Sequence, residues 1–391
     1  MKYLKKFENA QEYEAYINSS EAVYPNVCYI KESGEIAYNG AVPAEPTVIY
    51  LKQAITNPSE MITGEINGKQ IQLIRSNAHR YLGKHTGVGE MTICQLKDSD
   101  SNYYNTEVPA NLNGSEGDVF MRLPMFAYKV EDKGNDLWKI SFIYGIAPDA
   151  SWSQWDGNDL IGVYKSYVVG NKLYSRKISP YTNESQANYE AYAANRGEGF
   201  SIVKWKHHCI MAMLFYAIYG TTNSQTGLGR GGTSYTQSAN DSMTDVGKDC
   251  INFCGLVGWW GGHGEWMTGV NARYNEWSIV DDNGLVRTVN AVGSDGYILK
   301  MAIGKSFDLV PIAVGGTDAT GYCDEYRYSK VSDGVLLRSY YSNLLNGGIS
   351  YINGNSSPSA KGDNHASRLV FRGKLIEETD AEVFKNIAAI S

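Results

Sequence analysis

The sequence predicts a loop-rich α+β protein, and three observations lead to this fold class. The chain has 41 glycines and 29 tyrosines among its 391 residues, a composition that favours turns and wide aromatic surfaces. Short apolar segments with the period-two alternation of strands recur between Gly-containing connections. Only two long segments of the central part carry helix start and stop signals. We therefore expect short strands, few helices and extended loops.

The charge balance argues against several function classes. A net charge of −7 without a stripe of Lys and Arg disfavours a protein that binds nucleic acid through its phosphates. No apolar run approaches the roughly 20 residues of a membrane span, and no apolar core of a signal peptide follows Lys5 and Lys6. We expect a soluble protein without a secretion signal, a membrane span or a nucleic-acid partner.

A length of 391 residues predicts two or three folding units, at about 150 residues per domain. Boundaries are placed at Pro-rich and Gly-containing connections. The predicted segments are a small N-terminal module of a helix and a β-hairpin (1–42), a β-rich connecting module (43–114), a large domain (115–376) and a C-terminal helix (377–391).

The N-terminal module is expected to begin with a short helix over 10–17, because Asn9 can cap it with Glu12 three residues later. Segments 27–30 and 36–39 flank a Gly-containing connection and predict a hairpin. One helix and two strands are marginal alone, so we expect the module to pack on a neighbour. Two prolines then stiffen a linker over 41–46.

The connecting module is predicted to contain short strands over 48–51, 71–74 and 91–96, and to end near Gly114. The large domain then begins near Gly117. Its first elements are expected to be a strand after Gly117 and a hairpin. The hairpin strands are predicted over 127–130 and 138–144.

Two helices are predicted inside the large domain. Thr182 or Asn183 can cap the first, which ends at Gly197. The second covers about 206–219 and is apolar nearly all round, so it should be buried. A capping box that begins at Thr379 predicts the C-terminal helix.

A polar stretch leads into the closing strand of the large domain. Of the 30 residues over 338–367, 19 are Asn, Ser, Gly or Tyr, which can form hydrogen bonds and aromatic contacts but cannot bury a core. The following segment 367–373 alternates like a half-buried strand, with Leu369 and Phe371 on one face. We expect Leu369 and Phe371 to pack against Met211 and Phe215 of the second helix.

The sequence favours neither a metal nor a cofactor. Six cysteines are scattered along the chain and are expected to be free thiols. Cys250 and Cys254 are four residues apart, but no second pair completes a zinc site. The stretch 227–232 reads Gly-Leu-Gly-Arg-Gly-Gly, yet a predicted helix precedes it where a dinucleotide fingerprint needs a strand. The Trp-rich stretch 259–266 could stack on a sugar or fill the core, and we favour the core.

Four runs in the C-terminal half carry a resemblance to a known family: 315–317 (Gly-Gly-Thr), 322–328 (Tyr-Cys-Asp-Glu-Tyr-Arg-Tyr), 334–339 (Gly-Val-Leu-Leu-Arg-Ser) and 366–373 (Ala-Ser-Arg-Leu-Val-Phe-Arg-Gly). These runs, within residues 115–375, resemble the C-type-lectin-fold variable proteins of diversity-generating retroelements, as carried by gut Bacteroides-type bacteria and their phages. In that family a C-terminal patch is rewritten at adenine-rich codons while the framework stays constant. The resemblance implies a C-type-lectin-like, formylglycine-generating-enzyme-like domain that binds a ligand without catalysis.

The chain departs from two other groups that share this fold. Calcium-dependent lectins use Glu-Pro-Asn or Gln-Pro-Asp followed by Trp-Asn-Asp, and neither pattern occurs here. Formylglycine-generating enzymes use two closely spaced cysteines in the C-terminal half, but only Cys323 follows Cys254. A lectin-fold enzyme and a structural tail component without a ligand remain the alternative functions.

The resemblance also implies the contact residues and the partners. The partner would be a protein or glycan receptor on a target cell, and the location a phage tail or a bacterial cell surface. A tail location implies contacts with other tail proteins and favours a homotrimer. Candidate ligand-binding positions are those that adenine changes in AAC-type codons can reach. They are Tyr322, Asp324, Tyr326, Tyr340, Tyr341, Asn343, Asn346, Tyr351, Asn353, Asn355, Asp363, Asn364 and His365.

Overall fold

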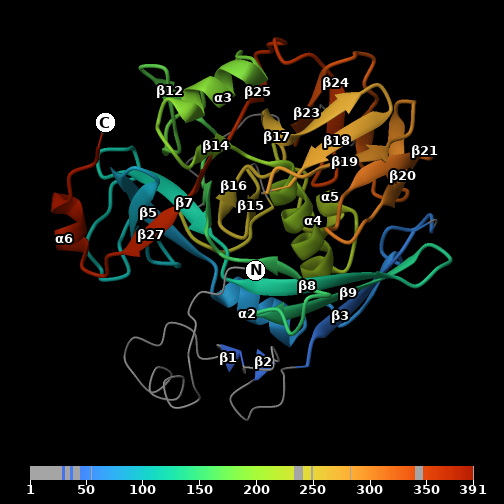
Figure 1. Cartoon of the computed structure of the whole chain (residues 1–391), viewed down its shortest axis with the longest axis horizontal. Coiled ribbons are helices and arrows are strands. Elements are labelled where there is room, and N and C mark those ends of the chain that lie inside the picture. The colour runs from blue at the N-terminus through green and yellow to red at the C-terminus, as the bar shows by residue number, and fades with distance from the viewer. Residues whose placement is uncertain are drawn as a thin grey trace.

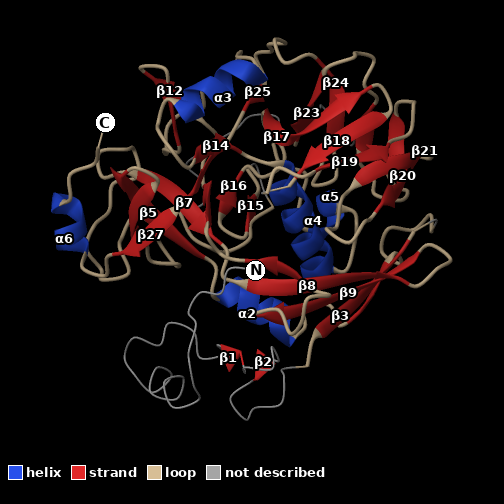
Figure 2. Ribbon diagram, viewed as in Figure 1, coloured by secondary structure: helices blue, strands red, loops and turns tan. Residues whose placement is uncertain are grey.

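The computed structural model describes residues 29–30, 36–37, 45–53, 55–232, 241–247, 250–281, 283–339 and 347–390. Strands dominate, and a few helices lie between and beside the sheets (Figures 1 and 2). This architecture confirms the loop-rich α+β class. No helix in the described ranges is long and apolar enough to cross a membrane.

The N-terminal module is described only in its hairpin. Strand β1 (Tyr29–Ile30) pairs antiparallel with β2 (Ile36–Ala37), which confirms the predicted pairing of these segments. The predicted helix over 10–17 and most of the linker over 41–46 lie outside the described residues.

A five-stranded sheet combines the connecting module with the large domain. Its order is β10-β8-β9-β3-β4. Its strands are β3 (Thr47–Lys52), β4 (Ile62–Gly64), β8 (Phe126–Asp132), β9 (Leu137–Tyr144) and β10 (Ser153–Trp155). Strand β3 alternates buried and half-buried residues, as expected for a strand with one face on the core. The predicted strand over 48–51 and the hairpin of β8 and β9 are confirmed.

A seven-stranded sheet has the order β14-β26-β11-β7-β5-β6-β27. Its strands are β5 (His79–Gly87), β6 (Glu90–Gln95), β7 (Asp118–Arg122), β11 (Asp159–Gly162), β14 (Phe200–Ile202), β26 (Leu369–Arg372) and β27 (Lys374–Glu377). The strand predicted over 91–96 is confirmed as β6. Because β5 pairs with β7 and β3 pairs with β9, the predicted boundary between 43–114 and 115–376 does not separate two sheets.

The C-terminal half builds a nine-stranded sheet. Its strands are β17 (Gly264–Arg273), β18 (Glu276–Val280), β19 (Val286–Asn290), β20 (Gly296–Ala302), β21 (Val310–Val314), β22 (Glu325–Arg327), β23 (Gly334–Arg338), β24 (Ile352–Ser356) and β25 (His365–Ala366). Two small ribbons join β12 (Tyr167–Val169) to β13 (Lys172–Tyr174) and β15 (Asn252–Phe253) to β16 (Leu256–Val257).

The first helix of the described chain corrects a prediction. Segment 71–74 is not a strand but part of α2 (Lys69–Ser76). The buried residues of this helix are Gln70, Ile71 and Ile74, a spacing of three and four that places them on one helical face. A four-residue apolar run does not distinguish a strand from a buried helix segment.

The other predicted helices are present with shifted starts. Helix α3 (Gln186–Ala194) is capped by Ser185, whose hydroxyl accepts the Asn188 N–H, rather than by Thr182 or Asn183. Helix α4 (Trp205–Tyr219) is buried along nearly its whole length, as predicted. The short α5 (Ser224–Gly227) follows it. Helix α6 (Ala381–Asn386) begins one residue later than the Thr379 box predicts, because the Asp380 carboxylate caps it.

The closing strand β26 lies between two cores, which corrects the predicted packing of Leu369 and Phe371. Met211 and Phe215 of α4 belong to the larger core, and the residue of β26 in that core is Val370. Leu369 and Phe371 belong to a second core, where the Phe371 ring meets the Phe200 ring at 5.0 Å between centroids. Leu369 and Phe371 share one face as predicted, but both faces of the strand are buried, so the expectation of a half-buried strand was wrong. Alternation does not say which face meets which layer.

Candidate functional site: the polar segment and its anchors

The structure places four of the thirteen predicted contact residues inside the protein. Tyr322, Asp324 and Tyr326 are fully buried and Tyr351 is 2% exposed. The Tyr322 hydroxyl donates to Gln53 Oε1 at 2.9 Å, and the Tyr326 ring meets that of Trp277 at 5.8 Å. Placing these four on the surface was wrong. Tyrosine packs in a core as well as on a surface, and the Asp324 carboxylate finds hydrogen-bond donors inside the protein.

Five predicted residues lie at or near the surface. Asn355 and Asp363 are exposed, and Asn353, Asn364 and His365 are half-buried. On β24 the neighbours of Asn353 and Asn355, which are Ile352 and Gly354, are buried, so the strand turns its asparagines outward. The remaining four candidates, Tyr340, Tyr341, Asn343 and Asn346, lie outside the described residues.

His365 differs from the other four because its half-buried side chain also packs against a core residue. Its ring meets the edge of the Trp266 ring at 4.9 Å. Burial lowers the pKa of the imidazole, so His365 is neutral at physiological pH. Its backbone belongs to β25, which pairs parallel with β17.

The buried carboxylate of Glu265 binds arginines at both ends of the polar stretch 338–367, which we call the polar segment. Glu265 on β17 binds Lys165 at 2.8 Å and Arg368 at 2.7 Å, and its second oxygen accepts from Arg338. All four side chains are fully buried. Burial alone would raise the pKa of the Glu265 carboxyl, but Arg368, Lys165 and Arg338 hold this pKa well below its ordinary value.

The two arginines bracket the polar segment in the sequence. Arg338 is the last residue of β23 and Arg368 directly precedes β26. The guanidinium of Arg338 also lies 3.6 Å from the centroid of the Trp259 ring. The two ends of the polar segment 338–367 therefore lie at one ion-pair cluster. Sequence reasoning missed Glu265, since a single Glu in a Trp-rich run carries no spacing signal.

A second buried carboxylate fixes the middle of the segment. Asp324 accepts the Ser350 N–H at 2.7 Å, and the Ile349 N–H donates to the Ser224 hydroxyl at 3.0 Å. A Cβ at Gly348 would lie 2.4 Å from both Asp324 Oδ1 and Ser224 Oγ, so only glycine allows this approach. Burial raises the pKa of Asp324 to about 7.

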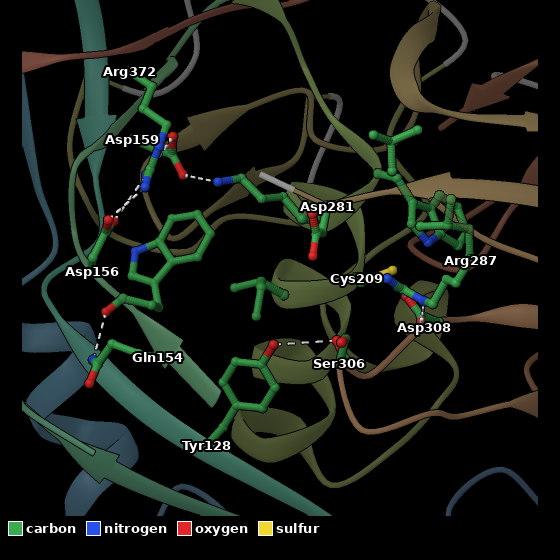
Figure 3. Close-up of a pocket in the computed structure, with 16 residues that line it drawn as sticks. Tyr128, Gln154, Asp156, Asp159, Cys209, Asp281, Arg287, Ser306, Asp308 and Arg372 are labelled. Carbon is green, nitrogen blue, oxygen red and sulfur yellow. Dashed lines mark hydrogen bonds and ion pairs between the residues drawn. The ribbon is translucent and has the colours of Figure 1, made fainter. Parts of the chain in front are cut away.

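A charged cavity of about 180 Å³ lies between β8, β10, α4 and the loop before β21 (Figure 3). On one side Arg372 holds Asp156 through two contacts of 3.0 and 2.6 Å. Arg372 also reaches Asp159 at 3.3 Å, and Lys206 reaches the other oxygen of Asp159 at 2.6 Å. These contacts neutralise both carboxylates.

The other side of this cavity is also neutralised. Arg287 forms an ion pair with Asp308. Burial raises the pKa of the nearby Cys209 thiol well above its ordinary value, and a protonated thiol is a poor nucleophile. Burial likewise lowers the pKa of His207 despite its contact with Asp159. We interpret the charged lining as an ion-pair network that joins β11, α4 and β26.

The tryptophans and the closely spaced cysteines considered in the sequence lie in the core. Trp259 and Trp260 are fully buried and fill the core, as favoured above. Cys250 and Cys254 are buried in the core. In the described part of the chain, no group of three or more His, Cys, Asp or Glu side chains is placed to hold a metal ion.

Comparison with known proteins found no matching protein-family model and no matching curated protein. Among solved structures, the Major Tropism Determinant M1 variant is 12% identical, covers 86% of this chain and 83% of its own, and has a TM-score of 0.31. The Major Tropism Determinant U1 variant is 11% identical, covers 96% of this chain and 100% of its own, and has a TM-score of 0.32. TM-scores this low establish no shared fold.

Proposed function

We propose that this chain is a non-enzymatic ligand-binding or receptor-binding protein whose contact surface is the outer side of the polar segment. The described members of this surface are Asn353, Asn355, Asp363 and Asn364, with His365 at its inner edge. The observation that carries the proposal is the cluster of Arg338, Glu265 and Arg368, which anchors both ends of the segment in the core.

Within the polar segment, one set of residues anchors the backbone and another set is exposed to solvent. Buried residues such as Ile352 and Tyr351 hold the backbone, while Asn355 and Asp363 face solvent. Binding residues are commonly carried on loops that a rigid scaffold positions. Asn, Ser and Asp side chains supply adaptable hydrogen bonds at such surfaces. The exposed positions can therefore change without disturbing the ion pairs below them.

A C-type-lectin-like fold for residues 115–376 belongs to the same proposal. The two longer helices of this range, α3 and α4, are those expected for such a domain, and the four-residue α5 follows α4. Near its start β7 pairs with β11, and near its end β26 pairs with the other edge of β11. This meeting of the two ends in one sheet supports the lectin-like plan.

The biological setting we propose is a phage tail or a bacterial surface. There the chain would recognise a protein or glycan receptor on a target cell, and a diversity-generating retroelement would rewrite the outer positions. The DNA beside the gene tests the second statement. A near-copy of codons 316–373 that differs only at template adenines, next to a reverse-transcriptase gene, is the expected finding; its absence would remove the retroelement from the proposal.

Binding itself is tested with the full chain labelled with a fluorophore and incubated with a panel of gut bacterial strains. We expect saturable binding to a subset of strains that excess unlabelled chain competes away. Uniform weak binding to all strains, or none to any, would favour the structural tail component. Detection of a turnover that depends on Cys323 would favour the lectin-fold enzyme.

A further inference from the structure

A second cavity, of about 440 Å³, is lined by residues of β5, β13 and the C-terminal segment from Lys385 to Ile390. Figure 1 shows β5 and α6, which contribute to its walls, on one side and β24 on the other. Its charged lining consists of five basic side chains and one carboxylate. These residues are Lys84, Lys172, Arg176, Arg196, Lys385 and Asp118. In a chain with a net charge of −7, this is a strong local reversal of charge.

Three of the basic side chains already have partners. Lys84 donates to the carbonyl oxygens of Phe384, Lys385 and Ile387 at 2.7–3.0 Å, which fixes the end of α6 as one wall. Arg196 binds Asp118 at 2.8 Å. Lys385 lies 3.9 Å from the carboxylate oxygens of both Glu116 and Glu382.

The other two basic side chains, Lys172 and Arg176, form no ion pair with any carboxylate in the described ranges of the chain. The Arg176 guanidinium stacks 3.8 Å above the centroid of the Tyr174 ring, and its Nε is buried without a hydrogen-bond partner. A buried guanidinium donor without a partner is costly. The Arg176 side chain also lines the cavity, where an anion would accept hydrogen bonds from the rest of the guanidinium.

Two further features mark the cavity as a built site. A Cβ at Gly114, which has a φ of +105°, would lie 2.2 Å from Arg176 Nε, so glycine alone lets the main chain cover the guanidinium here. His85 also lines the cavity. Its side chain belongs to a residue only 6% exposed, and its Nε2 has no hydrogen-bond partner.

We propose that this cavity binds a small organic anion, a carboxylate or phosphate group on a sugar-sized polar body. Arg176 and Lys172 bind the charged group, and His85 Nε2 forms a hydrogen bond with the body of the ligand. The volume falls within the range of about 300–1,000 Å³ that is usual for small-molecule sites. A bare phosphate ion would fill only a small part of it.

Isothermal titration calorimetry of the full chain tests this site with four probes: glucuronate, glucose 6-phosphate, glucose and inorganic phosphate. We expect saturable binding of glucuronate or glucose 6-phosphate, at least about tenfold tighter than that of glucose or inorganic phosphate. Absence of saturable heat with both anionic sugars up to about 10 mM would overturn the proposal. Equal affinity for glucose would overturn the charge recognition, and equal affinity for inorganic phosphate would overturn the sugar-sized body.

The double variant Lys172→Gln/Arg176→Gln should weaken binding of the anionic sugar at least about tenfold. The matched control Lys305→Gln/Lys330→Gln removes the same charge from exposed positions and should leave affinity unchanged. Arg176→Lys keeps the charge and should retain more affinity than Arg176→Gln, which separates charge recognition from misfolding. A control variant that loses as much affinity as the double variant would refute the site.

Discussion

Two buried carboxylates hold the polar segment, and their surroundings are opposite. Glu265 contacts three buried cations, Lys165, Arg338 and Arg368, and its pKa is held well below its ordinary value against the effect of burial. Asp324 accepts hydrogen bonds from a backbone N–H and an amide, and burial raises its pKa to about 7. The ends of the segment are therefore held by charge, and its middle is held by a group that titrates near neutrality.

This difference predicts unequal responses to mutation and to pH. An ion-pair cluster that loses one partner leaves uncompensated charges in the core. A buried carboxyl with a raised pKa instead destabilises the folded state only where it is ionised.

Glu265→Gln should be the most damaging change, because it leaves three cations without their shared carboxylate. We expect a loss of about 5 kcal/mol in unfolding free energy, or failure to fold. Chemical denaturation measures this loss. Glu276→Gln, at an exposed position of β18, is the matched control and should change stability by less than about 0.5 kcal/mol. Similar stabilities for the two variants would contradict the anchoring role of Glu265.

Phe371→Ala should cost about 4 kcal/mol, because it opens a cavity in the second core. The partner of Phe371 is tested by a double-mutant cycle. Coupling is expected between Phe371 and Phe200, whose rings meet at 5.0 Å, and not between Phe371 and Met211, which belong to different cores. Coupling to Met211 alone would restore the packing predicted from the sequence and refute the one described here.

These two sites show what the sequence could predict. The alternation of 367–373 and the apolar helix over 206–219 have strong local patterns, and both elements are present as β26 and α4. Which core each face of β26 contacts, and which cations Glu265 binds, depend on contacts between residues far apart in the chain. No local sequence pattern records such contacts. Tyr322 and Tyr326 were predicted on the surface and lie in the core for the same reason, since a tyrosine side chain suits a surface and a core alike.

Asp324→Asn should remove a pH dependence. The folded pKa of about 7 lies above the ordinary value of 3.8, so the folded state binds this proton more tightly than the unfolded state. The contribution of Asp324 to stability is then greatest below about pH 4 and falls as pH rises through 7. The Tm of the variant minus that of the parent should thus increase from pH 5 to pH 8, with Asp363→Asn as an exposed control. A constant difference would show that Asp324 does not titrate in this range.

The outer positions should be the least important for stability. Asn353, Asn355, Asp363 and Asn364 are exposed or half-buried, and surface substitutions usually change unfolding free energy by less than about 0.5 kcal/mol each. Alanine at all four should leave the fold intact. Receptor binding should nevertheless weaken, because contacts with a partner are lost.

The most direct test of this division is one experiment on the four-alanine variant of Asn353, Asn355, Asp363 and Asn364 in the full chain. Its Tm and its binding to a strain that the parent recognises are measured together, beside an Asn275→Ala/Asn290→Ala control at exposed positions. We predict a Tm within about 5 °C of the parent and at least about a tenfold loss of cell binding, with the control unchanged in both. Unfolding of the four-alanine variant, or cell binding equal to that of the parent, would contradict a contact surface carried on a separately anchored frame.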